Sequence, residues 1–296
     1  MDTSARLDAP HTLEATMDTL INLFVEHHVS RLLSAKHMRR TIVRHFGPLR
    51  QHALPEVTPL VLLVWFNAIG THSHSTANAC ASIVKCMFEF AITNRLYSGE
   101  NPAARLKKFP SRARDRFVVP EEMPRLQRAL VHATEQTQCF ILLCLLTGCR
   151  KTEALTMRWA DVDVLRGVWR KPHTKTGVHL IPIPRTLLDR LLKLPRLNEW
   201  VLGTVNGHLT ATVIYRRWNR IRWAADLGDV TIHDLRRSCA SWLAIHGENL
   251  AVISRGVLNH ASLNHTGIYA RLTTAPVALA LEKNSERMLG ATGHKG

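Results

Sequence analysis

The sequence predicts a mainly α-helical protein with one small antiparallel β-sheet, an α+β fold in two domains. Apolar residues recur at helical spacing along most of the chain. Residues 158–184 instead alternate and are rich in β-branched side chains around a TKTG turn, which is typical of a small sheet. A basic stretch that contains a proline, residues 107–116, lies between the N-terminal helical region and the region that contains the expected sheet. We therefore expect a helical N-terminal domain at 1–106, a linker at 107–118 and a second domain at 119–296.

Four helices are expected in the first domain, at residues 12–28, 35–46, 58–69 and 75–97. Thr12 and Thr58 suit N-caps, Pro59 suits a first helical turn, and Gly47 followed by Pro48 ends the second helix. The expected inner faces hold Met17, Leu20, Ile21, Phe24 and Val25 in the first helix, Met38, Ile42, Val43 and Phe46 in the second, and Ile83, Val84, Met87, Phe88 and Ala91 in the fourth.

The second domain is expected to open with a helix after Pro120, because proline and the following acids favour a helix N-terminus. The apolar residues 139–147 predict a buried helix that ends at Gly148. Residues 168–170 and 178–183 are the clearest strands. From Thr186 onward the pattern is helical again, including a basic helix at 210–227.

The charge balance favours a polyanionic partner. Lysine and arginine number 39 against 23 acidic residues, a net charge of +16, and nucleic acid is the usual partner of such an excess. An anionic membrane surface is a weaker alternative, because no strongly amphipathic basic helix is evident and the longest apolar run, 139–146, cannot span a bilayer. The six cysteines show no C-x-x-C spacing, so we expect reduced, structural thiols in a cytoplasmic protein.

Three basic stretches are candidate DNA contacts, although a solvated surface is the competing interpretation of each. The second helix carries cations with no acid among them, the linker is dominated by cations, and the 210–227 helix carries a basic stripe. The candidate DNA-binding residues are Lys36, Arg39, Arg40, Arg44, Lys107, Lys108, Arg112, Arg114, Arg216 and Arg220.

Four motifs carry candidate chemistry: LLTGCRKTEAL at 145–155, HTKTGVHLIPIP at 173–184, TIHDLRRSCASWL at 231–243 and LNHASLNHTGIYARL at 258–272. A tyrosine is a poor nucleophile near neutral pH unless cations, a proton donor and a proton acceptor assist it. Arginine suits a phosphate because its planar fork donates parallel hydrogen bonds. In chain order the motifs supply Arg150, Lys175, His233, Arg236, His260 and Tyr269. Tyr269 lies nine residues after His260.

In this order the motifs resemble those of the tyrosine recombinases of the phage integrase family. The resemblance covers about residues 117–288, and the N-terminal part more loosely resembles the core-binding domain that precedes the catalytic domain in that family. It implies that Tyr269 attacks a DNA phosphate and that Arg150 and Arg236 clamp it. It further implies that Lys175 protonates the leaving oxygen, with Lys171 as the alternative, and that His233 and His260 assist. Glu153 is expected to orient Arg150 or a histidine.

The resemblance implies site-specific recombination through a 3′-phosphotyrosine link, by a tetramer on double-stranded DNA sites, without a cofactor or a metal. It also allows accessory DNA-bending proteins. A type IB topoisomerase, a DNA-binding protein without catalysis and a decayed integrase remain alternatives. The chain departs from the family at Asn259, where glycine is frequent, and at Thr152. Residues 273–289 are expected to form a helix that docks on a neighbour or on its own domain, and no arm-site-binding domain is expected.

Overall fold

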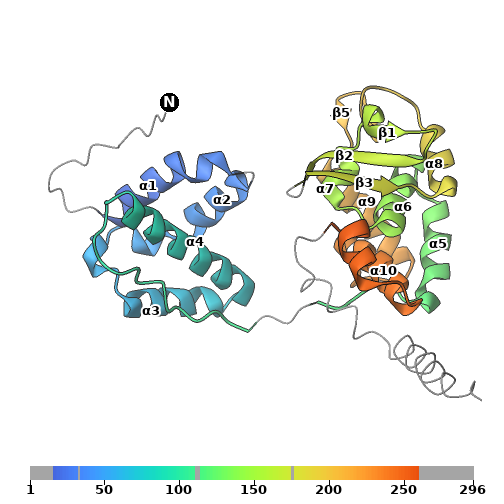
Figure 1. The fold of residues 1–296 in the computed structure, drawn as a ribbon. Coiled ribbons are helices and arrows are strands. Elements are labelled where there is room, and N and C mark those ends of the chain that lie inside the picture. The colour runs from blue at the N-terminus through green and yellow to red at the C-terminus, as the bar shows by residue number, and fades with distance from the viewer. Residues whose placement is uncertain (1–15, 33, 111–113, 175–176, 260–296) are drawn as a thin grey trace, which may run out of the picture. The chain divides into compact units, whose positions relative to one another are not determined.

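The computed structural model describes residues 16–32, 34–110, 114–174 and 177–259, and Figure 1 shows its elements. The chain divides into two compact units, Met1–Ala113 and Arg114–Gly296. The first is built from helices, and the second combines helices with small antiparallel sheets. The predicted fold class is therefore confirmed.

The first unit packs its helices around a single apolar core. Threonine or serine caps three of them: the side chains of Thr16, Thr58 and Ser73 each accept a hydrogen bond from a backbone N–H in the first turn. The helices are α1 (Met17–His27), α2 (Ala35–His45), α3 (Pro59–Gly70) and α4 (His74–Thr93), with short 3₁₀ turns at Val29–Arg31, Gly47–Leu49 and Leu54–Glu56.

The inner faces agree with the sequence pattern except at Val43. That side chain is 75% exposed, whereas Ile42 and Phe46 are buried. The reason is angular: successive helical residues are about 100° apart, so a face centred on Ile42 and Phe46 turns Val43 outward. Val25 is only partly buried against the core. The predicted cap Thr12 lies outside the described residues, and Thr16 caps α1 instead.

The predicted linker is divided between the two units. On the first unit, the Phe109 ring stacks on Phe66 and on His74, with ring centroids 4.6 and 4.2 Å away. The amide of Asn78 bonds both the N–H and the C=O of Phe109 at 2.9 Å. On the second unit, the N–H of Val118 donates to Ser238 Oγ at 2.8 Å. The predicted linker is therefore anchored on the first unit through Phe109 and on the second through Val118.

In the described part of the second unit, three α-helices precede the three-stranded sheet along the chain and three follow it. Its helices are α5 (Met123–Val131), α6 (Glu135–Thr147), α7 (Lys151–Leu155), α8 (Arg185–Leu192), α9 (Ala211–Ala224) and α10 (Ile232–Ile245), with 3₁₀ turns at Pro120–Glu122 and Trp159–Asp161 and a π-helical segment, η6 (Val252–Val257). Its strands are β1 (Val162–Asp163), β2 (Val168–Thr174), β3 (Gly177–Pro182), β4 (Gly203–Thr204) and β5 (Gly207–His208).

The larger sheet is antiparallel with order β1-β2-β3. In the β2–β3 pair, Lys171 lies opposite His179 and Thr174 opposite Gly177, with a shift of register between these two pairs. The smaller β4–β5 hairpin contradicts the expectation of continuous helix after Thr186. Its strands have only two residues each, too few for an alternating pattern to appear in the sequence.

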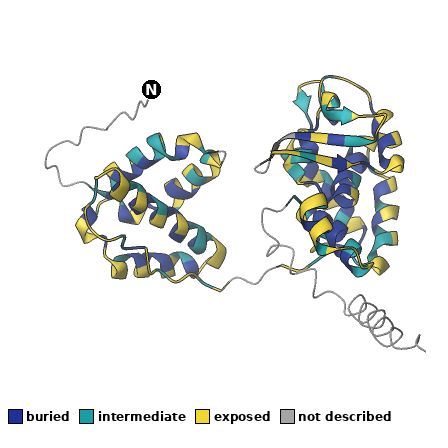
Figure 2. Ribbon diagram, viewed as in Figure 1, coloured by how far each residue is buried: buried dark blue, intermediate teal, exposed yellow. Residues whose placement is uncertain are grey.

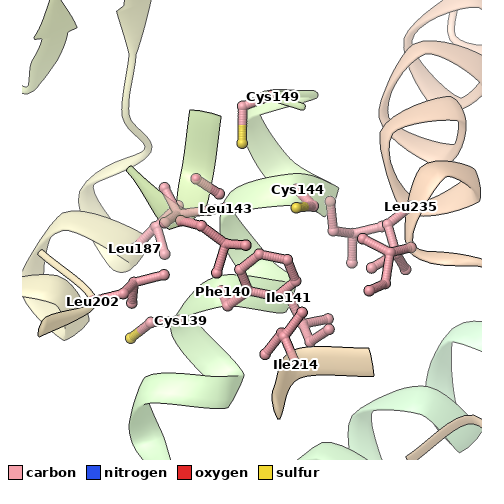
Figure 3. Packing of buried hydrophobic residues seen from close by; sticks show 14 of the residues in the cluster. Cys139, Phe140, Ile141, Leu143, Cys144, Cys149, Leu187, Leu202, Ile214 and Leu235 are labelled. Atoms are coloured by element: carbon pink, nitrogen blue, oxygen red, sulfur yellow. The ribbon is translucent and has the colours of Figure 1, made fainter. Parts of the chain in front are cut away.

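Helix α6 is the centre of the second unit's core. Figure 2 shows it buried, and its residues pack against Leu187 of α8, Ile214 of α9 and Leu235 of α10 (Figure 3). Burial of this kind raises the pKa of the Cys139 thiol to about 11 and that of Cys239 to about 12. All six cysteines are free. No helix among the described residues has the length and hydrophobicity needed to cross a membrane.

Candidate active site

Arg150 follows a turn that only glycine fits easily. Helix α6 ends at Gly148, whose φ of 62° lies in the left-handed region. A β-carbon on Gly148 would lie 3.1 Å from Cγ1 of Val257 and 3.3 Å from Cδ2 of Leu258. The chain then passes through the buried Cys149 to Arg150, the N-cap of α7. The Arg150 side chain is 45% exposed, so a rigid core helix presents an accessible guanidinium.

Glu153 fixes both ends of Arg150. Its carboxylate accepts hydrogen bonds from the backbone N–H of Arg150 at 2.8 Å and from Arg150 Nη1 at 2.9 Å. A third donor, Lys171 Nζ, lies 2.8 Å from Glu153 Oε2. Burial alone would raise the pKa of Glu153, but the hydrogen bond and charge of Lys171, together with Arg150, lower it overall. The carboxylate is therefore ionised near neutral pH and orients Arg150, one of the two roles expected for it.

Arg236 joins two segments that flank the site. Its side chain comes from α10 and is 4% exposed. One nitrogen, Nη1, donates to the carbonyl of Gly148, and Nη2 donates to the carbonyl of Leu258 at 2.6 Å. Arg236 thus ties the turn that precedes Arg150 to the segment that leads to His260.

His233 lies at the N-terminal end of α10, one turn before Arg236, and its side chain is only partly accessible to solvent. Partial burial lowers the pKa of the His233 imidazole, and the positive charges of Arg237 and Arg236 lower it further. The ring is therefore neutral at pH 7 and has a lone pair able to accept a proton or a hydrogen bond.

The neighbouring Asp234 is completely buried and organises the start of α10. Its carboxylate accepts from the backbone N–H and hydroxyl of Thr231 at 2.8 and 2.7 Å, and from Arg237 at 3.0 Å. Arg114 donates to the same carboxylate from Nε at 3.0 Å. Arg237 thus forms an ion pair with Asp234 on the same helix. Arg114, a candidate DNA contact, serves at least as an anchor for the start of this unit.

Lys175, His260 and Tyr269 lie outside the described residues. Thr174 and Gly177 pair across the hairpin and bracket positions 175–176 in the sequence. Lys171, the alternative to Lys175, is only 5% exposed and is paired with Glu153. Asn259 has a φ of 48°, in the left-handed region that glycine and asparagine tolerate better than other residues. The described part of the site therefore contains Arg150, Glu153, His233 and Arg236.

The candidate DNA contacts are mostly exposed. On α2, the four cations lie on the solvent side, and no carboxylate in the described part of the chain is within ion-pair distance of them. Lys108 Nζ donates to Ser82 Oγ at 2.7 Å. Arg112 lies outside the described ranges. The exposed candidates are Lys36, Arg39, Arg40, Arg44, Lys107, Lys108, Arg114, Arg216 and Arg220.

Sequence reasoning missed the structural parts played by Lys171 and His179. His179 Nε2 donates to the carbonyl of Gly256 at 2.9 Å, so strand β3 is attached to η6. The alternation of β2 and β3 could have flagged both residues, because they share a sheet face with the apolar Trp169 and Ile181, where polar side chains require partners. Across the ranges that the structure describes, no cluster of three or more His, Cys, Asp or Glu residues could hold a metal ion.

Comparison with known proteins identifies the family. The model of the phage integrase family matches residues 116–275, more than half of the chain. A putative prophage phiRv2 integrase of Mycobacterium tuberculosis is 26% identical over 245 residues, 73% of this chain and 64% of that protein. The ICEBs1 integrase of Bacillus subtilis is 24% identical over 234 residues, 69% of this chain and 63% of that protein. The chain thus spans slightly less than two thirds of these relatives. It belongs to the phage integrase family.

Solved structures agree in fold. The integrase of transposon Tn1549, in complex with transposon right end DNA, has a TM-score of 0.70 and 17% identity, covering 90% of this chain and 99% of that one. A lambda integrase dimer bound to a COC′ core site has a TM-score of 0.70 and 18% identity, covering 86% of this chain and 95% of that one. At such identity the likeness establishes the fold alone.

Proposed function

We propose that this protein is a site-specific DNA recombinase of the tyrosine type. The Tyr269 oxygen attacks the scissile phosphorus, a new P–O bond to tyrosine forms, and the P–O bond to the 5′-oxygen breaks. The products are a 3′-phosphotyrosine link and a free 5′-hydroxyl. A 5′-hydroxyl from a partner duplex then attacks the link, which restores the phosphodiester and releases Tyr269. Since the bond energy is kept in the link, no cofactor is needed.

The observation that carries this proposal is the convergence of Arg150 and Arg236 on one turn. Arg236, 86 residues further along the chain, donates to the carbonyl of Gly148, two residues before Arg150. Two guanidinium groups that flank the same turn can stabilise the charge that builds on the nonbridging oxygens of a phosphate under attack. A guanidinium has five N–H donors, so the carbonyl bonds of Arg236 are compatible with a phosphate contact.

The remaining roles follow from the chemistry of the side chains. Lys175 gives its proton to the leaving 5′-oxygen, which otherwise would depart as an alkoxide. His233, neutral at pH 7, accepts the phenolic proton or a hydrogen bond, and His260 donates to the same phosphate. The family match spans both His260 and Tyr269, which supports their inclusion.

We propose double-stranded DNA sites as the substrate and a tetramer on DNA as the active assembly, in the cytoplasm. Lambda integrase, a structural relative with a TM-score of 0.67, has been solved as a tetramer bound to a Holliday junction. Accessory DNA-bending proteins are a further proposed partner class. The relatives named by the comparisons are integrases and recombinases, which favours recombination over a topoisomerase reaction.

Covalent capture tests the reaction and finds the site together. The protein is incubated with random-sequence duplexes, and DNA that stays attached in SDS is sequenced. We expect enrichment of one sequence, attached through its 3′-phosphate, and complete loss of capture with Tyr269→Phe.

Tyr97→Phe is the matched control, since Tyr97 lies in the other unit and packs edge-on against Phe88. It should keep full capture. Equal capture by the Tyr269→Phe variant would refute the proposed nucleophile. Relaxation of a supercoiled plasmid without strand exchange between two captured sites would favour the topoisomerase alternative.

A further inference from the structure

A buried ion pair joins strand β2 to the start of α7. Lys171 lies within the strand, 5% exposed, with Nζ 2.8 Å from Glu153 Oε2 and 5.5 Å from the centre of the Trp169 ring. Burial lowers the pKa of the Lys171 ammonium, while the hydrogen bond to Glu153 opposes that change. A buried ammonium is tolerated only while it is paired, because loss of its partner leaves an uncompensated charge. The pair therefore holds β2 against α7.

Through Glu153, the same ion pair reaches Arg150. The Glu153 carboxylate accepts from Lys171 and, at the same time, from the backbone and the guanidinium of Arg150. A lysine on the sheet and the arginine of the proposed clamp thus share one acceptor. The shared carboxylate of Glu153 is the link between Lys171 and Arg150.

Strand β3 is also anchored, at the residue that pairs with Lys171. His179 faces Lys171 across the β2–β3 pair, and its Nε2 donates to the carbonyl of Gly256 in η6 at 2.9 Å. This fixes β3 to the segment that Arg236 also binds, through Leu258. The hairpin is consequently attached to α7 by one strand and to η6 by the other. Between the Lys171–His179 pair and the turn of the hairpin, the register shifts, and Thr174 then pairs with Gly177.

We propose that Lys171 and His179 are positioning residues, which set the place of the β2–β3 hairpin, and so of the proposed general acid Lys175, relative to Arg150. This proposal rests on the proposed recombinase function. It also separates the two lysines of the hairpin: the ammonium of Lys171 is committed to Glu153, so Lys175 remains the donor of the proton.

A sulfur-substituted substrate distinguishes a proton donor from a positioning residue. In a duplex with a 5′-bridging phosphorothiolate at the captured site, the P–S bond breaks and a thiolate leaves without needing a proton. Removal of the general acid should therefore matter little on this substrate. A misplaced clamp should slow cleavage of both substrates.

We expect Lys175→Met to cleave the oxygen substrate about 100-fold more slowly than the wild type and the sulfur substrate at nearly the wild-type rate. Lys171→Met should be about tenfold or more slower on both substrates, with DNA binding within about twofold of the wild type. Lys193→Met, at an exposed lysine after α8, is the matched control and should be unchanged on both.

The shared acceptor adds a second readout. If Lys171 acts through Glu153, the double variant Lys171→Met with Glu153→Gln should cleave no more slowly than the slower single variant. Independent, multiplying losses would contradict the proposed route to Arg150. Rescue of Lys171→Met by sulfur would also overturn the proposal, because it would make Lys171 the acid.

His179 keeps the test usable if Lys171→Met fails to fold. His179→Gln retains an N–H donor for Gly256 and should cleave at close to the wild-type rate, whereas His179→Leu should be slower on both substrates. Equal rates for the leucine and glutamine variants would remove His179 from the proposal. If the wild type forms no covalent adduct at all, the recombinase function itself fails, which is a separate result.

Discussion

The side chain of Arg236 donates to the carbonyl of Leu258 at 2.6 Å and to the carbonyl of Gly148, so one buried arginine connects two ends of the site. A lysine replaces the two separate donor nitrogens of the guanidinium fork by one ammonium nitrogen, so it cannot occupy both donor positions. We expect Arg236→Lys to lower the free energy of unfolding by about 2 kcal/mol and to slow cleavage about 100-fold. Urea denaturation and single-turnover cleavage measure the two effects, with Arg237→Lys as the control.

Arg150 should affect chemistry more than stability, since its side chain is 45% exposed. Arg150→Lys keeps the charge and loses the planar fork. We expect cleavage to fall about 100-fold while the unfolding free energy changes by less than about 0.5 kcal/mol. A gel-shift measurement on the captured site should give an affinity near that of the wild type. A parallel loss of affinity and cleavage would make Arg150 a DNA anchor rather than part of a clamp.

Gly148 offers a test without any change of charge. At a φ of 62°, alanine pays for a left-handed conformation, and its β-carbon would also press on Val257 at 3.1 Å. We expect Gly148→Ala to destabilise the protein by about 1–2 kcal/mol and to slow cleavage by moving Arg150. Gly247→Ala, with a φ of 85° and no atom within 4 Å of the added carbon, is the matched control. It should show the conformational cost with little loss of cleavage.

Histidine titration predicts the direction of the pH dependence. The pKa values of His179 and His233 are lowered in the folded protein, chiefly by burial. The unfolded chain therefore binds more protons at pH 5–6, and stability should rise with pH up to about 7. Thermal melts from pH 5 to 8 check this. His179→Gln should show a weaker dependence than the wild type, and an unchanged slope would mean that other groups control it.

The basic face of α2 predicts a steep dependence of DNA affinity on salt. Each phosphate contact contributes about 0.9 to the slope of log affinity against log salt. Replacing Lys36, Arg39, Arg40 and Arg44 together with alanine should flatten that slope by up to about 3.6. Arg166→Ala is the control. Arg166 belongs to the second unit, where its Nη1 lies 3.8 Å from Oδ2 of Asp163 in the same unit. An unchanged slope would place the DNA elsewhere.

Local signals made much of the fold predictable. Thr58 and Pro59 begin α3 as expected, and Gly148 ends α6, because caps and left-handed turns depend on a few adjacent residues. Arg150 and Arg236 could be proposed from the sequence because their motifs are compact and ordered, and the structure brings Arg236 to the turn that precedes Arg150. Val43 was misplaced since the helical face is decided by partners on other helices, which a sequence window does not contain.

The Lys171–Glu153 pair could not be predicted for a different reason. The two residues are 18 positions apart and belong to a strand and a helix. Their pairing depends on how the sheet packs against α7, and a lysine in a strand otherwise indicates an exposed position. The anchoring of the predicted linker was hidden in the same way, since charge suggested solvent while Phe109 and Val118 found partners within their own units.

The buried cysteine thiols allow local unfolding around α6 to be measured by their accessibility to a reagent. Cys139 and Cys144 lie on the core helix α6, Cys149 lies in the turn before Arg150, and Cys239 lies on α10; each is less than 10% exposed. A maleimide reagent can reach them only when that region separates. The labelling rate of each thiol would therefore report how often its surroundings open. These measurements need no added probe, because the cysteines are native to the sequence.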